Sequence, residues 1–317
     1  MARKIRGPGT NAKVAVLIPH GPIRRTRPTG FPMKHVCKFL VCLVLWLGWV
    51  VFAQTEPLLK TRGQWQQGGI VFGQVTPGSQ VRFAERAVRI TDAGDFVIGL
   101  GPEAPAEVVL EVLDPNGRKT LHTFAVGQRQ YKTQHVKGVE QKHVAPPPEF
   151  TERIAREAEL VSGVRHRDDA RLDFLQDFIW PLSGPITGVY GSRRVYNGTP
   201  RAPHFGLDIA GPTGTKVIAP AAGLVTLAED DLFYSGGTLI VDHGHGLSST
   251  FIHLSKILVK PGESVVQGQA IAEVGATGRV TGPHLDWRMN WFEVRLDPAL
   301  LMADKPMPGR GAGAAEK

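Results

Sequence analysis

The chain has 317 residues, 42% of them hydrophobic, which is ordinary for globular protein and allows about two domains. Its formal net charge of +8 is misleading, because residues 1–53 hold nine Lys or Arg and no acidic residue, whereas residues 54–317 hold 28 basic and 29 acidic side chains. Nucleic-acid binding needs clustered positive charge on the folded part, so we expect no nucleic-acid partner.

The basic N-terminal stretch has the composition of a leader. Residues 1–32 are rich in Arg, Pro and Gly without periodicity, and we predict a disordered leader or a mis-assigned start, with Met33 as the functional beginning. Residues 33–53 combine a basic start with an apolar run at 39–52, which predicts a signal peptide and export to the periplasm or cell envelope. That run is shorter than the about 20 residues of a membrane span, so we expect no span after cleavage; an uncleaved anchor is the alternative.

Short apolar or alternating runs between residues 64 and 138 are separated by turn-forming sequences. Strands at this spacing predict a β-sandwich-like domain over residues 54–145. We find no catalytic or metal-binding motif in this domain and interpret it as a targeting or spacing module. Three histidines lack ligand spacing and are interpreted as surface or packing residues: His122, His135 and His143.

The next segment, residues 146–179, predicts a linker and a connecting helix. Three prolines at 146–148 are typical of a stiff linker. Helix-forming residues follow at 151–161, with Thr151 as the expected N-cap. At the other end of the chain, residues 304–317 are rich in Gly, Pro and Ala and predict a disordered tail.

Residues 180–303 are again rich in strand patterns, which we place at 217–225, 238–242, 249–253, 270–274 and 285–291. His243 and His245 resemble a metal pair at first sight. They lie in the glycine-rich sequence at 242–246, which favours a turn.

Three segments of this region carry side chains that could bind metal. His204 and Asp208 flank Gly206; four residues of straight strand span about 13 Å, so this segment must curl, and Gly206 is where it can. His253 lies in an apolar strand, and His284 and Asp286 stand two residues apart, which places them on one face of a strand.

These motifs resemble the LytM and lysostaphin type of zinc metalloendopeptidase, a peptidoglycan hydrolase, over about residues 180–300. The family pattern H-x-x-x-D, a Y-x-H-L-S-like strand and G-P-H-L-H corresponds here to H-F-G-L-D, F-I-H-L-S and G-P-H-L-D. Glycine-punctuated stretches at 214–225 and 259–269 also match. The resemblance implies a compact antiparallel β-sheet domain, the duplicated hybrid motif, with its site in an open groove. Asp286 departs from the pattern, because the family usually has His there.

The resemblance implies one Zn²⁺ held by His204, Asp208 and Asp286, with one position left for water. His253 and His284 would be the catalytic groups that move protons or hold the oxyanion. The expected function is that of an exported endopeptidase that cleaves peptidoglycan stem or cross-link peptides. Other envelope or division proteins are further candidate partners.

Two alternatives stay open. Some relatives have lost metal ligands and bind the wall or activate another wall hydrolase, and the altered third ligand, Asp286, keeps this alternative alive. A purely structural envelope protein that binds wall polymer is the other alternative, although the coincidence of four polar positions argues against it.

We predict that the mature protein begins near Gln54 and contains no thiol, because both cysteines, Cys37 and Cys42, lie in the leader. Intact-mass measurement of protein recovered from the envelope tests this. A mass that retains Cys37 and Cys42 would indicate the anchored form instead.

Overall fold

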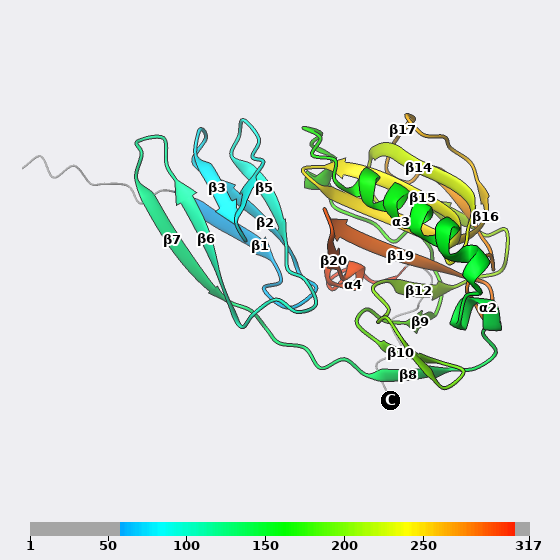
Figure 1. Ribbon diagram of the computed structural model, residues 1–317. Coiled ribbons are helices and arrows are strands. Elements are labelled where there is room, and N and C mark those ends of the chain that lie inside the picture. The colour runs from blue at the N-terminus through cyan, green and yellow to red at the C-terminus, as the bar shows by residue number, and fades with distance from the viewer. Residues whose placement is uncertain (1–57, 308–317) are drawn as a thin grey trace, which may run out of the picture. The chain divides into compact units, whose positions relative to one another are not determined.

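A computed structural model describes residues 58–307, which are mostly β (Figure 1). The predicted leader, the signal peptide at 33–53 and residues 308–317 of the predicted tail lie outside the described residues. The strands pair almost entirely antiparallel, which confirms the mainly β fold class. None of the helices within residues 58–307 is long and apolar enough to cross a bilayer.

The N-terminal half forms two antiparallel sheets, with strand orders β1-β2-β5 and β4-β3-β6-β7. In β3, buried Val81 and Phe83 alternate with exposed residues, as expected for a strand that packs on one face. Gly73 is required in β2, since a Cβ there would collide with the Phe96 ring. The bounds are β1 Leu59–Gly63, β2 Ile70–Val75, β3 Gln80–Phe83, β4 Arg86–Val88, β5 Asp95–Gly99, β6 Glu107–Leu113 and β7 Lys119–Ala125.

The C-terminal half is built on a ten-stranded sheet whose main path runs β17-β14-β15-β16-β19-β12-β9. Three strands lie off this path: β18 pairs with β16 and β13, and β20 pairs with β19. Phe251 of β16 and Trp287 of β19 are fully buried and face each other in the register of these two strands. The bounds are β9 Ile186–Gly188, β12 Leu207–Ala210, β13 Lys216–Ile218, β14 Gly223–Leu232, β15 Gly236–Gly244, β16 Leu247–Ile257, β17 Ser264–Val265, β18 Ala270–Val274, β19 His284–Trp291, β20 Val294–Leu296 and α4 Pro298–Leu301.

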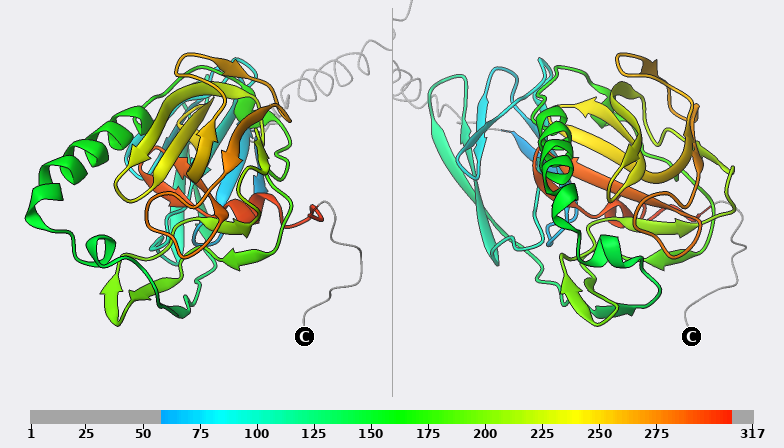
Figure 2. Two further views of the ribbon diagram at one scale, coloured as in Figure 1. Left: turned by 90° about the vertical axis from the view of Figure 1, so that its right-hand side faces the viewer. Right: turned by 45° about the vertical axis from the view of Figure 1, so that its right-hand side comes forward.

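Helix α3, Thr151–Arg165, is the predicted connecting helix (Figure 2). Its Val161 and Val164 pack against Leu227, Leu232 and Ile240 of β14 and β15. The predicted cap was wrong by one residue, because Phe150 holds the N-cap position and no side chain caps the helix. The shorter helices are α2 Gln141–Val144, η1 Pro148–Phe150 and η2 Asp173–Leu175.

Strand β8, Thr133–Val136, lies within the range that we assigned to the N-terminal domain, yet it pairs in parallel with β10. Strand β10, Arg193–Tyr196, pairs in turn with β11, Thr199–Arg201. This small sheet therefore joins the segment between the two halves to the loop that precedes β12.

Residues 304–307, at the start of the predicted tail, contact the body of the chain. Met307 is 7% exposed, Lys305 Nζ donates to the Phe178 carbonyl, and Trp180 Nε1 donates to the Lys305 carbonyl. Ordered contacts therefore continue to the last described residue.

The two halves contact each other through β19, β20 and the loop that follows. Arg86 lies 3.9 Å over the Phe292 ring, and the Phe83 and Trp291 ring centroids are 6.1 Å apart. Arg129 pairs with buried Asp297 at 2.8 Å. Asp297 also accepts a hydrogen bond from Ala299 N and so begins α4.

Phe251→Ala should lower the free energy of unfolding by about 3–5 kcal/mol, because it leaves a cavity in the sheet core. Denaturant unfolding followed by tryptophan fluorescence measures this change. Leu121→Ala is the control, since Leu121 is 61% exposed on β7 and should change stability by less than about 0.5 kcal/mol. Equal losses in the two variants would contradict the assigned core.

Candidate metal centre

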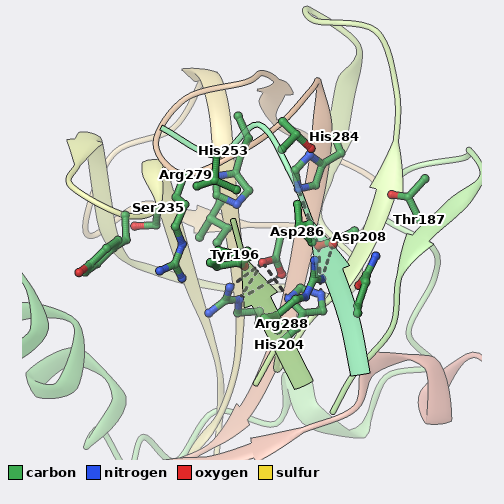
Figure 3. A pocket seen from close by; sticks show the side chains of 18 residues that line it. Thr187, Tyr196, His204, Asp208, Ser235, His253, Arg279, His284, Asp286 and Arg288 are labelled. Carbon is green, nitrogen blue, oxygen red and sulfur yellow. Dashed lines mark hydrogen bonds and ion pairs between the residues drawn. The ribbon is translucent and has the colours of Figure 1, made fainter. Parts of the chain in front are cut away.

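The register of three neighbouring strands brings the predicted site residues together. Asp208 of β12 lies directly opposite Asp286 of β19, and Asp286 lies opposite Ile252 of β16. His204 precedes β12, His253 follows Ile252, and His284 begins β19. All five predicted residues line one cavity of about 210 Å³ (Figure 3).

His204, Asp208 and Asp286 form a compact buried group. They offer one ligand atom each, and these atoms all lie within 4.8 Å of one another. His204 Nε2 lies 3.1 Å from Asp208 Oδ1, and His204 Nδ1 lies 3.8 Å from Asp286 Oδ2. This is the only such group of His, Cys, Asp and Glu side chains in residues 58–307.

Glycine is needed at position 206 for a reason that differs from the predicted curl. Gly206 does not have a positive φ. A Cβ at this position would collide with Asp286 Oδ1 and press on the Arg288 side chain. Gly188 of β9 likewise leaves room for Asp208, since a Cβ added at position 188 would collide with Asp208 Oδ2. Both glycines leave room for the carboxylates.

His253 is aimed into the cavity by a β-bulge. Ile252 and His253 together stand opposite Thr238 alone, because the register shifts between Leu239–Phe251 and Gly237–Leu254. His253 has a φ of 66°, in the left-handed region, and its backbone N donates to the Ser235 carbonyl. Such backbone conformations are strained and cluster at functional sites.

The tautomers of the two remaining histidines follow from their partners. His253 Nδ1 lies 2.8 Å from the Thr277 carbonyl, and His284 Nδ1 lies 2.8 Å from the Gly282 carbonyl. A carbonyl only accepts, so each Nδ1 carries the proton, and in the neutral ring each Nε2 carries a lone pair. The two rings lie 4.9 Å apart, and His284 Nε2 is 3.8 Å from Asp208 Oδ1.

Burial and neighbouring charges set the protonation of the site. Burial lowers the pKa of His253 to about 3, so this ring is neutral near pH 7. Burial raises the pKa of Asp286, but the adjacent Arg288 and His204 lower it more, and the pKa lies well below its ordinary value. Burial likewise raises the pKa of Asp208, His204 and His284 lower it, and it lies below its ordinary value.

Two arginines that we did not predict hold the carboxylates. Arg194 donates to Asp208 Oδ2 at 2.9 Å, and Arg288 donates to both oxygens of Asp286 at 2.6–3.1 Å. Arg288 could have been found from its spacing, since it stands two residues after Asp286 on the same strand face. Arg194 has no such signal, because it comes from a separate strand.

The donor set fits a single borderline dication such as Zn²⁺. His204 Nε2 and Asp208 Oδ1 are buried, and neither makes a hydrogen bond in the structure. His284 Nε2 also lies 3.8 Å from Asp208 Oδ1, so one more nitrogen that can bind a metal through its lone pair in the neutral ring faces the same point. A metal ion satisfies such a group, and Zn²⁺ takes nitrogen and carboxylate ligands.

The other histidines contribute no ligand here. His243 is fully buried, with Nδ1 bonded to the Ala222 carbonyl and Nε2 to Ser249 Oγ, and His245 has a φ of 53° at the turn. His143 packs edge-on against Phe233. The structure places none of these three in the metal group.

Comparison with known proteins relates the C-terminal half to a peptidase family. A family model described as Peptidase family M23 matches residues 202–298. A crystal structure from Pseudomonas aeruginosa that carries the name peptidase M23 is 32% identical with a TM-score of 0.60, covering 75% of this chain and 95% of that one. The likeness therefore extends well beyond the residues that the family model matches.

Two curated relatives match the chain over shorter stretches. Peptidoglycan DD-endopeptidase ShyA of Vibrio cholerae is 42% identical over 105 residues, which are 33% of this chain and 24% of that protein. Cell division protein DipM of Caulobacter vibrioides is 31% identical over 170 residues, 52% of this chain and 25% of that protein. The chain thus spans about a quarter of the length of these relatives.

Gly206→Ala should reduce bound zinc at least about tenfold, because the new methyl group displaces Asp286 or opens β12 from β19. Metal content of the purified protein, measured by plasma mass spectrometry, tests this. Gly163→Ala is the control, since a Cβ in that helix meets nothing within 4 Å. Full zinc content in Gly206→Ala would contradict the proposed need for glycine beside the Asp286 carboxylate.

Proposed function

This chain belongs to peptidase family M23, and we propose that it is an exported, zinc-dependent endopeptidase that hydrolyses peptide bonds in peptidoglycan stem or cross-link peptides. One observation carries the proposal: the ligand atoms of His204, Asp208 and Asp286 lie within 4.8 Å of one another, beside two imidazoles whose Nδ1 atoms are bonded to backbone carbonyls. The similarity to ShyA, a peptidoglycan DD-endopeptidase, supports the substrate class.

Three residues would hold the metal: His204, Asp208 and Asp286. A bound Zn²⁺ would supply a Lewis acid and would lower the pKa of a coordinated water to about 7. Arg194 and Arg288 fix the carboxylates through hydrogen bonds, and Asp208 Oδ1 is left without one. Such outer contacts orient the ligands of metal sites.

His253 and His284 would move the protons of the reaction. His253 Nε2 is a lone-pair atom on a neutral ring, so it can accept the proton of the attacking water. His284, 4.9 Å away, can hold the developing oxyanion once it is protonated, or pass a proton to the leaving amine. The carbonyls of Thr277 and Gly282 hold both rings in the orientation that this transfer needs.

The leader supports export to the periplasm or cell envelope, because a basic start precedes an apolar run. Peptidoglycan is present in that compartment. The similarity to DipM, a cell division protein, makes division proteins further candidate partners.

A second candidate function is that of a catalytically impaired module that binds the wall or activates another wall hydrolase. The bidentate contact between Arg288 and Asp286 favours it, since a guanidinium already neutralises the carboxylate at the position where related enzymes have a histidine ligand. On this candidate the cluster would be held by ion pairs alone and would need no metal.

Purified residues 54–317 should release muropeptides from peptidoglycan, and a chelator should abolish the release, as measured by mass spectrometry. Asp286→Ala should lose zinc and at least about a hundredfold in activity, because an open ligand position weakens the metal. Asp286→His should keep zinc and shift the pH midpoint of activity downward, since a neutral ligand leaves the metal more acidifying.

Asp242→Ala is the matched control, because Asp242 is a buried carboxylate outside the cavity. Its zinc content and activity should match the unaltered protein. A metal-free protein that binds peptidoglycan without cleaving it would decide for the second candidate function.

A further inference from the structure

Arg279 lines the cavity and lies between two aromatic rings. Its guanidinium carbon lies 4.9 Å from the Tyr196 ring centroid and 4.7 Å from that of Tyr234. The side chain is half-buried and lines the same cavity as His253 and His284 (Figure 3). Two aromatic faces therefore hold the guanidinium at the edge of the candidate site.

The guanidinium of Arg279 lacks an acceptor. Arg194 is bonded to Asp208 and Arg288 to Asp286, whereas the Arg279 side chain makes no hydrogen bond or ion pair with any residue between 58 and 307. Arginine stays protonated in proteins, and its planar fork matches a carboxylate. The cavity thus presents one unpaired cation with five N–H donors.

The charge balance of the cavity also favours an anionic ligand. Three guanidiniums face two carboxylates there, so the lining carries a net charge of +1 when the histidines are neutral. A bound dication would add to this excess. Positive lining in a partly enclosed cavity attracts anions and strengthens their binding.

Backbone contacts fix the position of Arg279. Its N–H donates to the Tyr234 carbonyl at 2.9 Å, and Gly278 before it has a φ of 71°, which glycine adopts without strain. Thr277 Oγ1 accepts from Gly237 N and donates to the Leu254 carbonyl. The loop that carries Arg279 is therefore tied to the same turn and strand that position His253.

We propose that Arg279 is a specificity-determining residue that binds a carboxylate of the substrate peptide close to the bond that is cut. This rests on the proposed function, which makes the substrate a peptide. The carboxylate has two possible sources, the C-terminus of the peptide and a side chain within it. Both present the same planar, two-oxygen group to the guanidinium.

The test uses three matched wall-derived peptides: one with all carboxylates free, one amidated at its C-terminus and one amidated at its side-chain carboxylate. Calorimetry in the presence of chelator measures affinity without turnover, and hydrolysis of each peptide is measured on the zinc-loaded protein. The unaltered protein should bind the free peptide about ten- to a hundredfold more tightly than one of the two amides. The amide that loses affinity identifies which carboxylate is bound.

Arg279→Gln should bind all three peptides with the weak affinity of the disfavoured amide, and should raise KM more than it lowers kcat. Arg279→Lys should retain part of the preference, because it keeps the charge and loses the planar fork. Arg86→Gln is the control, since Arg86 also lies over two aromatic rings, those of Trp291 and Phe292, but does not line the cavity.

Equal affinity of the unaltered protein for all three peptides would overturn the inference, and this arm requires no variant to fold. An equal loss for all three peptides in Arg279→Gln, with the preference intact, would show a purely structural stacking role and would also overturn it. If the protein prefers one peptide but hydrolyses none, the result supports carboxylate binding by Arg279 and refutes the proposed endopeptidase function. If it hydrolyses the peptides without a preference, the result supports the endopeptidase function and refutes carboxylate binding by Arg279.

Discussion

Two buried carboxylates, Asp208 and Asp286, stand directly opposite each other on β12 and β19. Several neighbouring side chains are placed so that they offset the repulsion between these two charges. Like charges about 5 Å apart repel by about 3 kcal/mol at an effective dielectric constant of about 20. Arg194 and Arg288 each neutralise one of them from the side, and His204 lies against both. A dication that binds here would meet ligands that are already held in place.

The sequence predicted the strands that carry the site, because alternating apolar residues and turn glycines are local signals. It also predicted the convergence of His204, Asp208, His253, His284 and Asp286, although by resemblance rather than by geometry. The resemblance could not reveal why Gly206 is needed, since its missing Cβ makes room for a side chain 80 residues away. It could not place Arg194 beside Asp208 either, because that contact depends on how β10 folds back.

The segment between the two β-rich halves is more than a spacer. Gln134, Val136 and Val139 line the cavity, and Asn197 Nδ2 donates to the Val139 carbonyl. The sequence did not predict that this segment would line the cavity, because β8 is short and its partner β10 lies about 60 residues further along the chain. Residues that follow the N-terminal sheets in the chain therefore form part of the cavity wall.

The left-handed backbone at His253 shows that the position of its ring has a cost in folding energy. The bulge holds a residue with a side chain where glycine would rest without strain, at a cost of about 1 kcal/mol or more. Replacement of His253 by glycine would remove the imidazole from the cavity and relieve the backbone in the same step. The packing of the buried ring and its contact with the Thr277 carbonyl would be lost as well, so the relief of strain would be offset.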